Sequence, residues 1–123
     1  MNALGTHLLL DLKGCNPRLL DNVDYIKEAM VGAAAEAGAT VLGESFHKFQ
    51  PVGVTGVVII SESHICIHTW PEHRYAAVDI FTCGDAFAPR KAADIIIQRL
   101  ESTDRTITEV PRGLLPELAT ARA

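Results

Sequence analysis

The side chains best suited to chemistry are concentrated in one short segment, residues 61–72, of this 123-residue chain. The segment carries serine, glutamate, histidine, cysteine and tryptophan side chains, and another cysteine, Cys83, follows one predicted strand later. The sequence contains no Gly-x-Ser-x-Gly elbow, no phosphate-binding glycine loop and no His-Glu-x-x-His helix. No standard hydrolase signature is therefore present, and the residue types of this segment are what indicates its chemistry.

Two mechanisms follow from the residue types alone. His64, Cys66 and His68 alternate along one predicted strand, so they share a face, and imidazole and thiolate together are zinc ligands. That spacing is permissive for a metal, but histidines on strands more often have structural partners. Alternatively, His68 activates Ser63 or Cys83 as a nucleophile. Taken singly, each of these residues is better explained as an ordinary strand-end or packed residue.

Composition limits the class of protein. With 48% hydrophobic and 21% charged residues, the chain has the composition of one globular domain. Its net charge of −4 and its scattered basic residues argue against a nucleic-acid partner. No leader pattern precedes residue 8 and no apolar run is long enough to span a bilayer, so we expect a cytoplasmic protein without a membrane partner. Three cysteines without a close pair suggest free thiols.

The elements that must position these side chains alternate between strand and helix periodicity. Apolar residues at three and four spacing predict helices over residues 19–37 and 91–101, the first of them starting after an Asn16-Pro17 cap. Stretches rich in β-branched and aromatic residues predict strands over 5–11, 40–50, 54–61, 64–70, 75–83 and 105–110. We therefore expect an α+β fold, a two-layer α/β sandwich in which two helices cover one face of an antiparallel sheet.

The other face of the sheet carries the reactive side chains. Period-two alternation puts Tyr75, Asp79, Phe81 and Cys83 on one side of their strand, away from Ala76, Val78 and Ile80. On the preceding strand His64, Cys66 and His68 are likewise separated from Ile65 and Ile67. Two helices cannot cover both faces, and a half-apolar face of this kind is usually buried by a partner. We therefore expect a homodimer formed around it.

Three ordered segments resemble the short bacterial and archaeal S-adenosylmethionine decarboxylases, which are pyruvoyl-dependent proenzymes. They are SESH (61–64), HTWPE (68–72) and YAAVDIFTCG (75–84). The resemblance continues upstream through GTHLLLD (5–11) and through positions 49, 51, 53, 54, 56 and 57. It thus covers most of the chain up to residue 84.

The resemblance implies that the chain cuts itself between Glu62 and Ser63. In that family the serine hydroxyl attacks the preceding carbonyl to give an ester, and β-elimination and hydrolysis then leave a pyruvoyl group with loss of ammonia. A single domain, residues 1–123, would become a β chain, 1–62, and an α chain, 63–123. His68 matches the processing histidine, and Thr55 stands where the family usually has an assisting serine.

The resemblance also implies the reaction. The pyruvoyl group derived from Ser63 would form a Schiff base with the amine of S-adenosylmethionine and take up the electrons released with carbon dioxide, without a metal. Cys83 matches the family's proton donor. Phe49 and Trp70 match aromatic positions suited to the sulfonium and adenine, and Glu72 matches a carboxylate that binds ribose hydroxyls. In the family two protomers share each site, and the product donates aminopropyl groups for spermidine synthesis.

Rival functions remain at this stage. A related pyruvoyl enzyme could act on ornithine or arginine, although Phe49, Trp70 and Glu72 are needed only for a nucleoside. An unprocessed, silent chain could regulate an active paralogue, although Ser63, His68 and Cys83 are all present. A zinc-dependent hydrolase is the most distant alternative.

Overall fold

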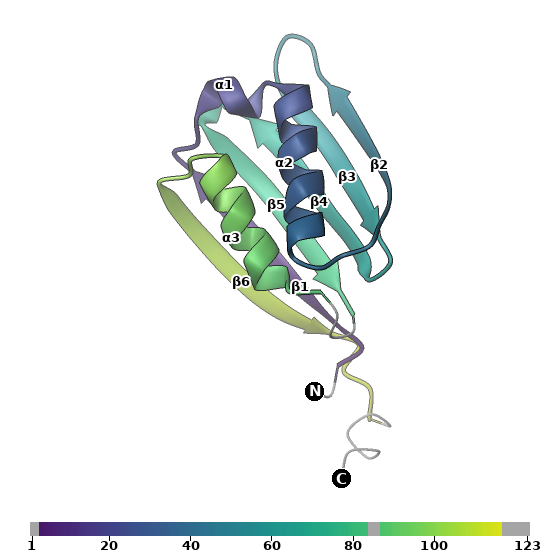
Figure 1. The fold of residues 1–123 in the computed structure, drawn as a ribbon. Helices are drawn as coiled ribbons and strands as arrows, with labels where there is room; N and C mark the ends of the chain where they lie inside the picture. Colours follow the sequence, from purple (N-terminus) through teal and green to yellow (C-terminus); the bar gives the residue numbers. More distant parts are fainter. Residues whose placement is uncertain (1–2, 84–86, 117–123) are drawn as a thin grey trace.

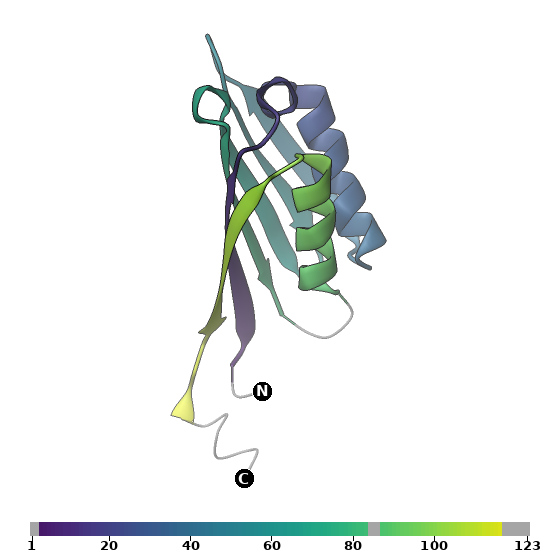
Figure 2. The same ribbon diagram turned by 90° about the vertical axis from the view of Figure 1, so that its left-hand side faces the viewer.

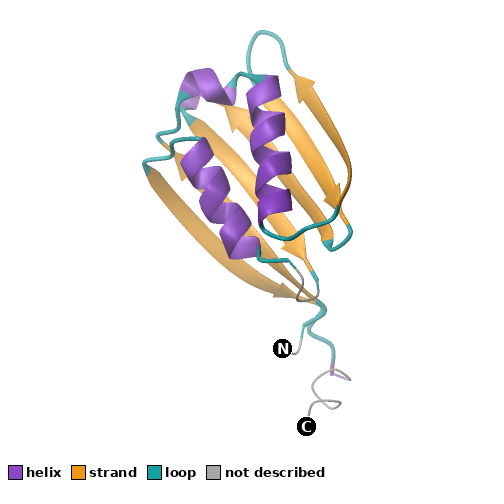
Figure 3. Ribbon diagram, viewed as in Figure 1, coloured by secondary structure: helices purple, strands orange, loops and turns teal. Residues whose placement is uncertain are grey.

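A computed structural model describes residues 3–83 and 87–116. The strands form a six-stranded antiparallel sheet in the order β2-β3-β4-β5-β1-β6 (Figures 1 and 3). The strands are β1 (Gly5–Lys13), β2 (Val41–Lys48), β3 (Val54–Ile60), β4 (Ser63–Trp70), β5 (Tyr75–Thr82) and β6 (Asp104–Arg112). The helices are α1 (Pro17–Leu20), α2 (Val23–Glu36), the 3₁₀ turn η1 (Pro71–His73) and α3 (Pro89–Arg99).

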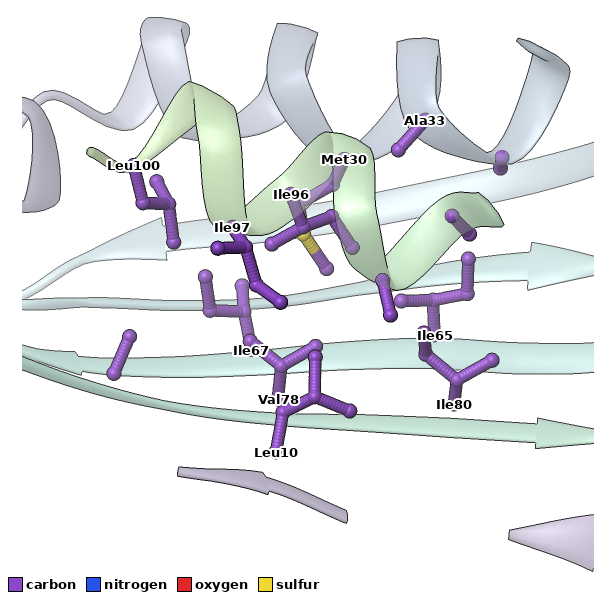
Figure 4. Close-up of a cluster of buried hydrophobic side chains, with 14 of the residues drawn as sticks. Leu10, Met30, Ala33, Ile65, Ile67, Val78, Ile80, Ile96, Ile97 and Leu100 are labelled. Carbon is purple, nitrogen blue, oxygen red and sulfur yellow. The ribbon is translucent and has the colours of Figure 1, made fainter. Parts of the chain in front are cut away.

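The helices α2 and α3 lie on one side of the sheet, as the edge-on view shows (Figure 2). Between the layers Met30 of α2 and Ile96 of α3 meet Ile65, Ile67 and other buried aliphatic side chains of the central strands (Figure 4). The predicted α+β sandwich is thereby confirmed. Alternate residues of each central strand face the helices, and most of these residues are aliphatic, so the core between the layers is apolar.

One predicted helix is wrong in its extent. Residues 19–37 do not form one helix, because the chain breaks at residues 21–22 into α1 and α2. The Asn22 side chain accepts a 3.0 Å hydrogen bond from the backbone N–H of Tyr25, so Asn22 caps a new helix instead of continuing the old one. The predicted Asn16 cap is confirmed, since Asn16 accepts from the N–H of Arg18 at 3.0 Å.

We call the sheet surface opposite the helices the open face. Alternation from the buried positions assigns to it fourteen residues of the four strands β1, β3, β4 and β5: His7, Leu9, Asp11, Thr55, Val57, Ile59, His64, Cys66, His68, Trp70, Tyr75, Ala77, Asp79 and Phe81. In the described part of the chain no helix covers this surface (Figure 2). Ile59 and Trp70 are 49% and 42% exposed. The predicted mixed aromatic and reactive face is therefore present.

Candidate functional site

The Glu62–Ser63 bond lies in the tight connection between β3 and β4. Ser63 is paired with Ile60 across this hairpin and has a φ of +148°, a conformation that disfavours residues with a side chain. Thr40 makes two hydrogen bonds to this connection. The Thr40 carbonyl accepts from the N–H of Ser61 at 2.9 Å. The Thr40 N–H donates to a Glu62 carboxylate oxygen at 3.4 Å. The backbone at Ser63 is therefore strained and held in place.

Cys83 contacts the carbonyl oxygen of Glu62 in two ways. Its backbone N–H donates to that oxygen at 3.0 Å, and its thiol donates to it at 3.4 Å. Two donors on one carbonyl oxygen draw electrons from the carbonyl carbon and stabilise negative charge that develops on the oxygen. The structure thus brings together Glu62, Ser63 and Cys83, three of the residues singled out from the sequence.

His64 adjoins this group from the open face. Its Nδ1 lies 3.4 Å from the hydroxyl oxygen of Ser63, and its ring packs against Phe81 with the centroids 5.8 Å apart. Sequence reasoning considered His64 only as a metal ligand. Its position directly after Ser63, at the start of a strand, was the one available signal of this contact.

His68 and Thr55 form a second group at the other end of β4. They are partners in the β3–β4 register, and the hydroxyl of Thr55 lies 3.1 Å from Nδ1 of His68. His68 is five positions along the strand from Ser63, which corresponds to about 16 Å. The structure therefore does not bring His68 to Ser63 or to Cys83 within one chain.

A cavity of about 310 Å³ beside His68 is lined by the predicted substrate-binding residues Phe49, Trp70 and Glu72. Trp70 packs against Tyr75 with the centroids 5.4 Å apart. Tyr75 in turn donates a hydrogen bond to the Asp11 carboxylate, and this bond, with partial burial, raises the pKa of Tyr75 to about 12. The three residues predicted to bind the substrate are thus brought together at the end of the sheet remote from Cys83.

The loop that carries Phe49 is held to the helix layer by charged side chains. Asp21, between α1 and α2, accepts hydrogen bonds from the Gly53 N–H at 2.8 Å and from the Lys48 ammonium at 3.0 Å. These bonds lower the pKa of Asp21, the bond from Gly53 most of all. Lys48 also donates to the Phe49 carbonyl at 2.8 Å. Nothing in the spacing of Asp21 and Lys48 pointed to this pairing.

Cys66 lies at the centre of the open face, in a hollow of about 280 Å³ that His47 and His68 also line. Burial, and secondly the charge of Asp79, raise the pKa of the Cys66 thiol, so the thiol holds its proton more firmly than an exposed cysteine. Across residues 3–83 and 87–116 no three histidine, cysteine or acidic side chains are grouped as metal ligands. His64, Cys66 and His68 are therefore not grouped as zinc ligands within one chain.

Comparison with known proteins points to one family. The family model described as S-adenosylmethionine decarboxylase matches residues 6–113. A protein of Caldanaerobacter subterraneus named S-adenosylmethionine decarboxylase proenzyme is 54% identical over 114 residues, covering 93% of this chain and 92% of the relative. A Clostridium kluyveri protein of the same name is 47% identical over 123 residues, covering 100% of this chain and 98% of the relative.

A solved structure agrees with these sequences. The crystal structure of the adenosylmethionine decarboxylase of Aquifex aeolicus superposes with a TM-score of 0.87 at 42% identity and covers 94% of this chain and 95% of that chain. Within the described residues, no helix has the length and apolar character needed to cross a membrane.

Proposed function

Because the chain belongs to the S-adenosylmethionine decarboxylase family, we propose that it decarboxylates S-adenosylmethionine after cutting its own backbone between Glu62 and Ser63. The observation that carries this proposal is the double hydrogen bond from Cys83 to the Glu62 carbonyl, next to a strained Ser63. Attack by the Ser63 hydroxyl puts negative charge on that oxygen, where two donors already lie. Ser63 then becomes the pyruvoyl group of the α chain.

The pyruvoyl group derived from Ser63 would supply an electron-withdrawing carbonyl, suited to condense with the substrate amine and to take up the electrons left by carbon dioxide. Cys83 would lie beside this group, because its thiol is 3.4 Å from the carbonyl oxygen of Glu62, the residue before Ser63. A thiol at this position is suited to return a proton to the substrate carbon after decarboxylation. Phe49, Trp70 and Glu72 bind the nucleoside, because aromatic faces attract a sulfonium and stack on adenine while a carboxylate accepts from ribose hydroxyls.

The separation of the two groups supports a homodimer with shared sites. Ser63 and Cys83 lie at one end of the central strands, and His68 lies about 16 Å away at the other end. When two open faces pack together, a two-fold axis that lies between them and runs across the strands brings the Ser63 end of one protomer against the His68 end of its partner. The contact is reciprocal, so two equivalent sites form. The partner's His68 then removes the Cα proton from the ester formed at Ser63.

Intact mass measured under denaturing conditions on freshly purified and incubated protein tests the self-cleavage. Two fragments divided between Glu62 and Ser63, the C-terminal one lighter by the loss of ammonia, are expected. Ser63→Ala is the matched control, because it keeps the fold and lacks the attacking oxygen. A wild-type chain that stays full length on long incubation overturns the cleavage, and the silent regulatory reading then takes its place.

Carbon dioxide release by the cut protein tests the substrate. We expect release from S-adenosylmethionine and none from ornithine or arginine, because neither amino acid has a base or ribose for Phe49, Trp70 and Glu72 to bind. Trp70→Ala should raise the KM for S-adenosylmethionine at least about fivefold, since base stacking contributes roughly 1–3 kcal/mol. Decarboxylation of an amino acid in preference to the nucleoside contradicts the assignment.

A further inference from the structure

We propose that His64 is the catalytic base of the first step of self-cleavage, accepting the hydroxyl proton of Ser63 as that hydroxyl attacks the Glu62 carbonyl. The inference rests on the proposed cleavage at Glu62–Ser63 and assigns it a residue that acts within the same chain. His64 Nδ1 lies 3.4 Å from the Ser63 hydroxyl oxygen, a reach from which a proton can pass once the groups close on one another.

The other acids and bases near Ser63 are already engaged or too far away. The Glu62 carboxylate accepts from the Thr40 N–H, and the Cys83 thiol donates to the Glu62 carbonyl. His7 is two strands away from β4 in the sheet order, a distance of about 10 Å. Within residues 3–83 and 87–116, His64 is therefore the base in contact with the attacking oxygen.

The environment of His64 favours this use. Its ring packs against Phe81, which limits its movement and keeps Nδ1 directed at Ser63. To accept from the hydroxyl, the neutral ring carries its proton on Nε2. The carbonyl under attack is held from the other side by Cys83. A base, a nucleophile and two oxyanion donors are thus arranged around one peptide bond.

The proposed step is balanced without any other reactant. The Ser63 oxygen forms a bond to the Glu62 carbonyl carbon while its proton passes to His64 Nδ1. The bond from that carbon to the Ser63 nitrogen then breaks, and the proton moves from His64 to the departing nitrogen. The products are an ester and a free amine, and His64 ends neutral as it began. Removal of the Cα proton is left to the partner's His68.

Hydroxylamine separates the two steps, because it cleaves an ester between residues 62 and 63 and leaves an amide intact. Wild type, His64→Ala, His64→Asn and His68→Ala are compared by intact mass with and without hydroxylamine, after circular dichroism and thermal unfolding confirm the fold. His64→Asn keeps a hydrogen-bond acceptor but cannot take up a proton. His68→Ala keeps the proposed first base and lacks the second.

We expect ester formation to slow about 10²-fold or more in both His64 variants, which is the usual contribution of a general base. Those chains stay full length with and without hydroxylamine, and added imidazole partly restores cleavage of His64→Ala. His68→Ala, in contrast, accumulates a hydroxylamine-sensitive chain. A folded His64→Asn that forms ester at the wild-type rate overturns this role while the proposed cleavage stands. A wild type that never cleaves overturns the cleavage itself.

Discussion

Cys83 has two tasks in the proposed cycle, and a single variant separates them. In Cys83→Ala the backbone N–H still donates to the Glu62 carbonyl and only the weaker thiol bond is lost. Self-cleavage should therefore slow about tenfold or less, less than the effect of losing a stronger oxyanion donor. Decarboxylation per cut chain should fall at least about 10²-fold, because the proton donor is gone.

Both rates come from one preparation, with cleavage followed by intact mass and decarboxylation by carbon dioxide release normalised to cut chains. Cys66→Ala is the matched control, since it removes a thiol that contacts neither Glu62 nor Ser63. If the rates of self-cleavage and decarboxylation fall by the same factor in Cys83→Ala, the two roles of Cys83 are not separable. The 3.4 Å hydrogen bond from the thiol then contributes as much to self-cleavage as the thiol does to decarboxylation.

Tyr75 predicts a pH dependence of stability. Its pKa is raised to about 12, chiefly because the phenol donates to Asp11, whereas an unfolded tyrosine titrates near pH 10. Between these values the folded chain holds a proton that the unfolded chain has lost. The resulting stabilisation is complete below pH about 10 and is lost as the pH rises toward about 12.

Denaturant unfolding at a fixed protein concentration measures this effect. The free energy of unfolding of wild type should fall more steeply from pH about 10 to about 12 than that of Tyr75→Phe, which has no phenolic proton. Parallel profiles of the two proteins would mean that the Asp11 contact does not favour the protonated phenol in solution.

At the scale of elements, the loop that presents Phe49 depends on Asp21 and Lys48. Asp21→Asn or Lys48→Met weakens the bonds that hold Gly53 and the Phe49 carbonyl. We expect the KM for S-adenosylmethionine to rise about three- to tenfold, the range for one partly exposed charged contact, with kcat and self-cleavage unchanged.

Steady-state kinetics of fully cut protein measure this loop effect. Lys27→Met is the matched control, because it breaks an ion pair of similar length, Lys27 to Glu44 at 2.9 Å, on α2 and β2 away from the loop. An equal KM in Asp21→Asn and Lys27→Met would contradict the positioning role of Asp21.

Periodicity predicted the elements better than their connections. Alternation along β4 and β5 located both faces of the sheet, because side-chain direction in a strand follows from residue parity alone. The break before Val23 was missed, since apolar spacing runs through it and only the Asn22 cap marks a new start. The placement of β1 between β5 and β6 is a long-range choice that local periodicity does not encode.

The sequence predicted which residues belong to the candidate site, but not that they lie in two groups at opposite ends of β4. Motif resemblance named Ser63, His68 and Cys83 together, yet the structure separates the histidine from the other two along one strand. That separation could have been anticipated from strand rise, because residues five apart on a strand cannot meet. Contacts between distant segments, such as Asp21 with Gly53, left no local signal in the sequence.

At the scale of the whole molecule, the proposed shared site predicts complementation. Ser63→Ala provides an intact His68, and His68→Ala provides an intact Ser63, so a mixed dimer contains one complete processing site. Each variant alone should stay uncut, and mixing them under conditions that exchange protomers should cut only the His68→Ala chain. Intact mass distinguishes the two chains. Cutting of His68→Ala alone at the wild-type rate would contradict the shared site.

The order of the strands in the sheet affects how the protein refolds after the proposed cut. A cut after Glu62 assigns β1, β2 and β3 to one fragment and β4, β5 and β6 to the other, and in the sheet β1 lies between β5 and β6. The two fragments are interwoven, so the cut chain stays together although its backbone is broken. Once unfolded, however, the fragments must find each other again by diffusion, and recovery becomes dependent on concentration. The proposed cut would therefore replace the folding of one chain by the association of two fragments.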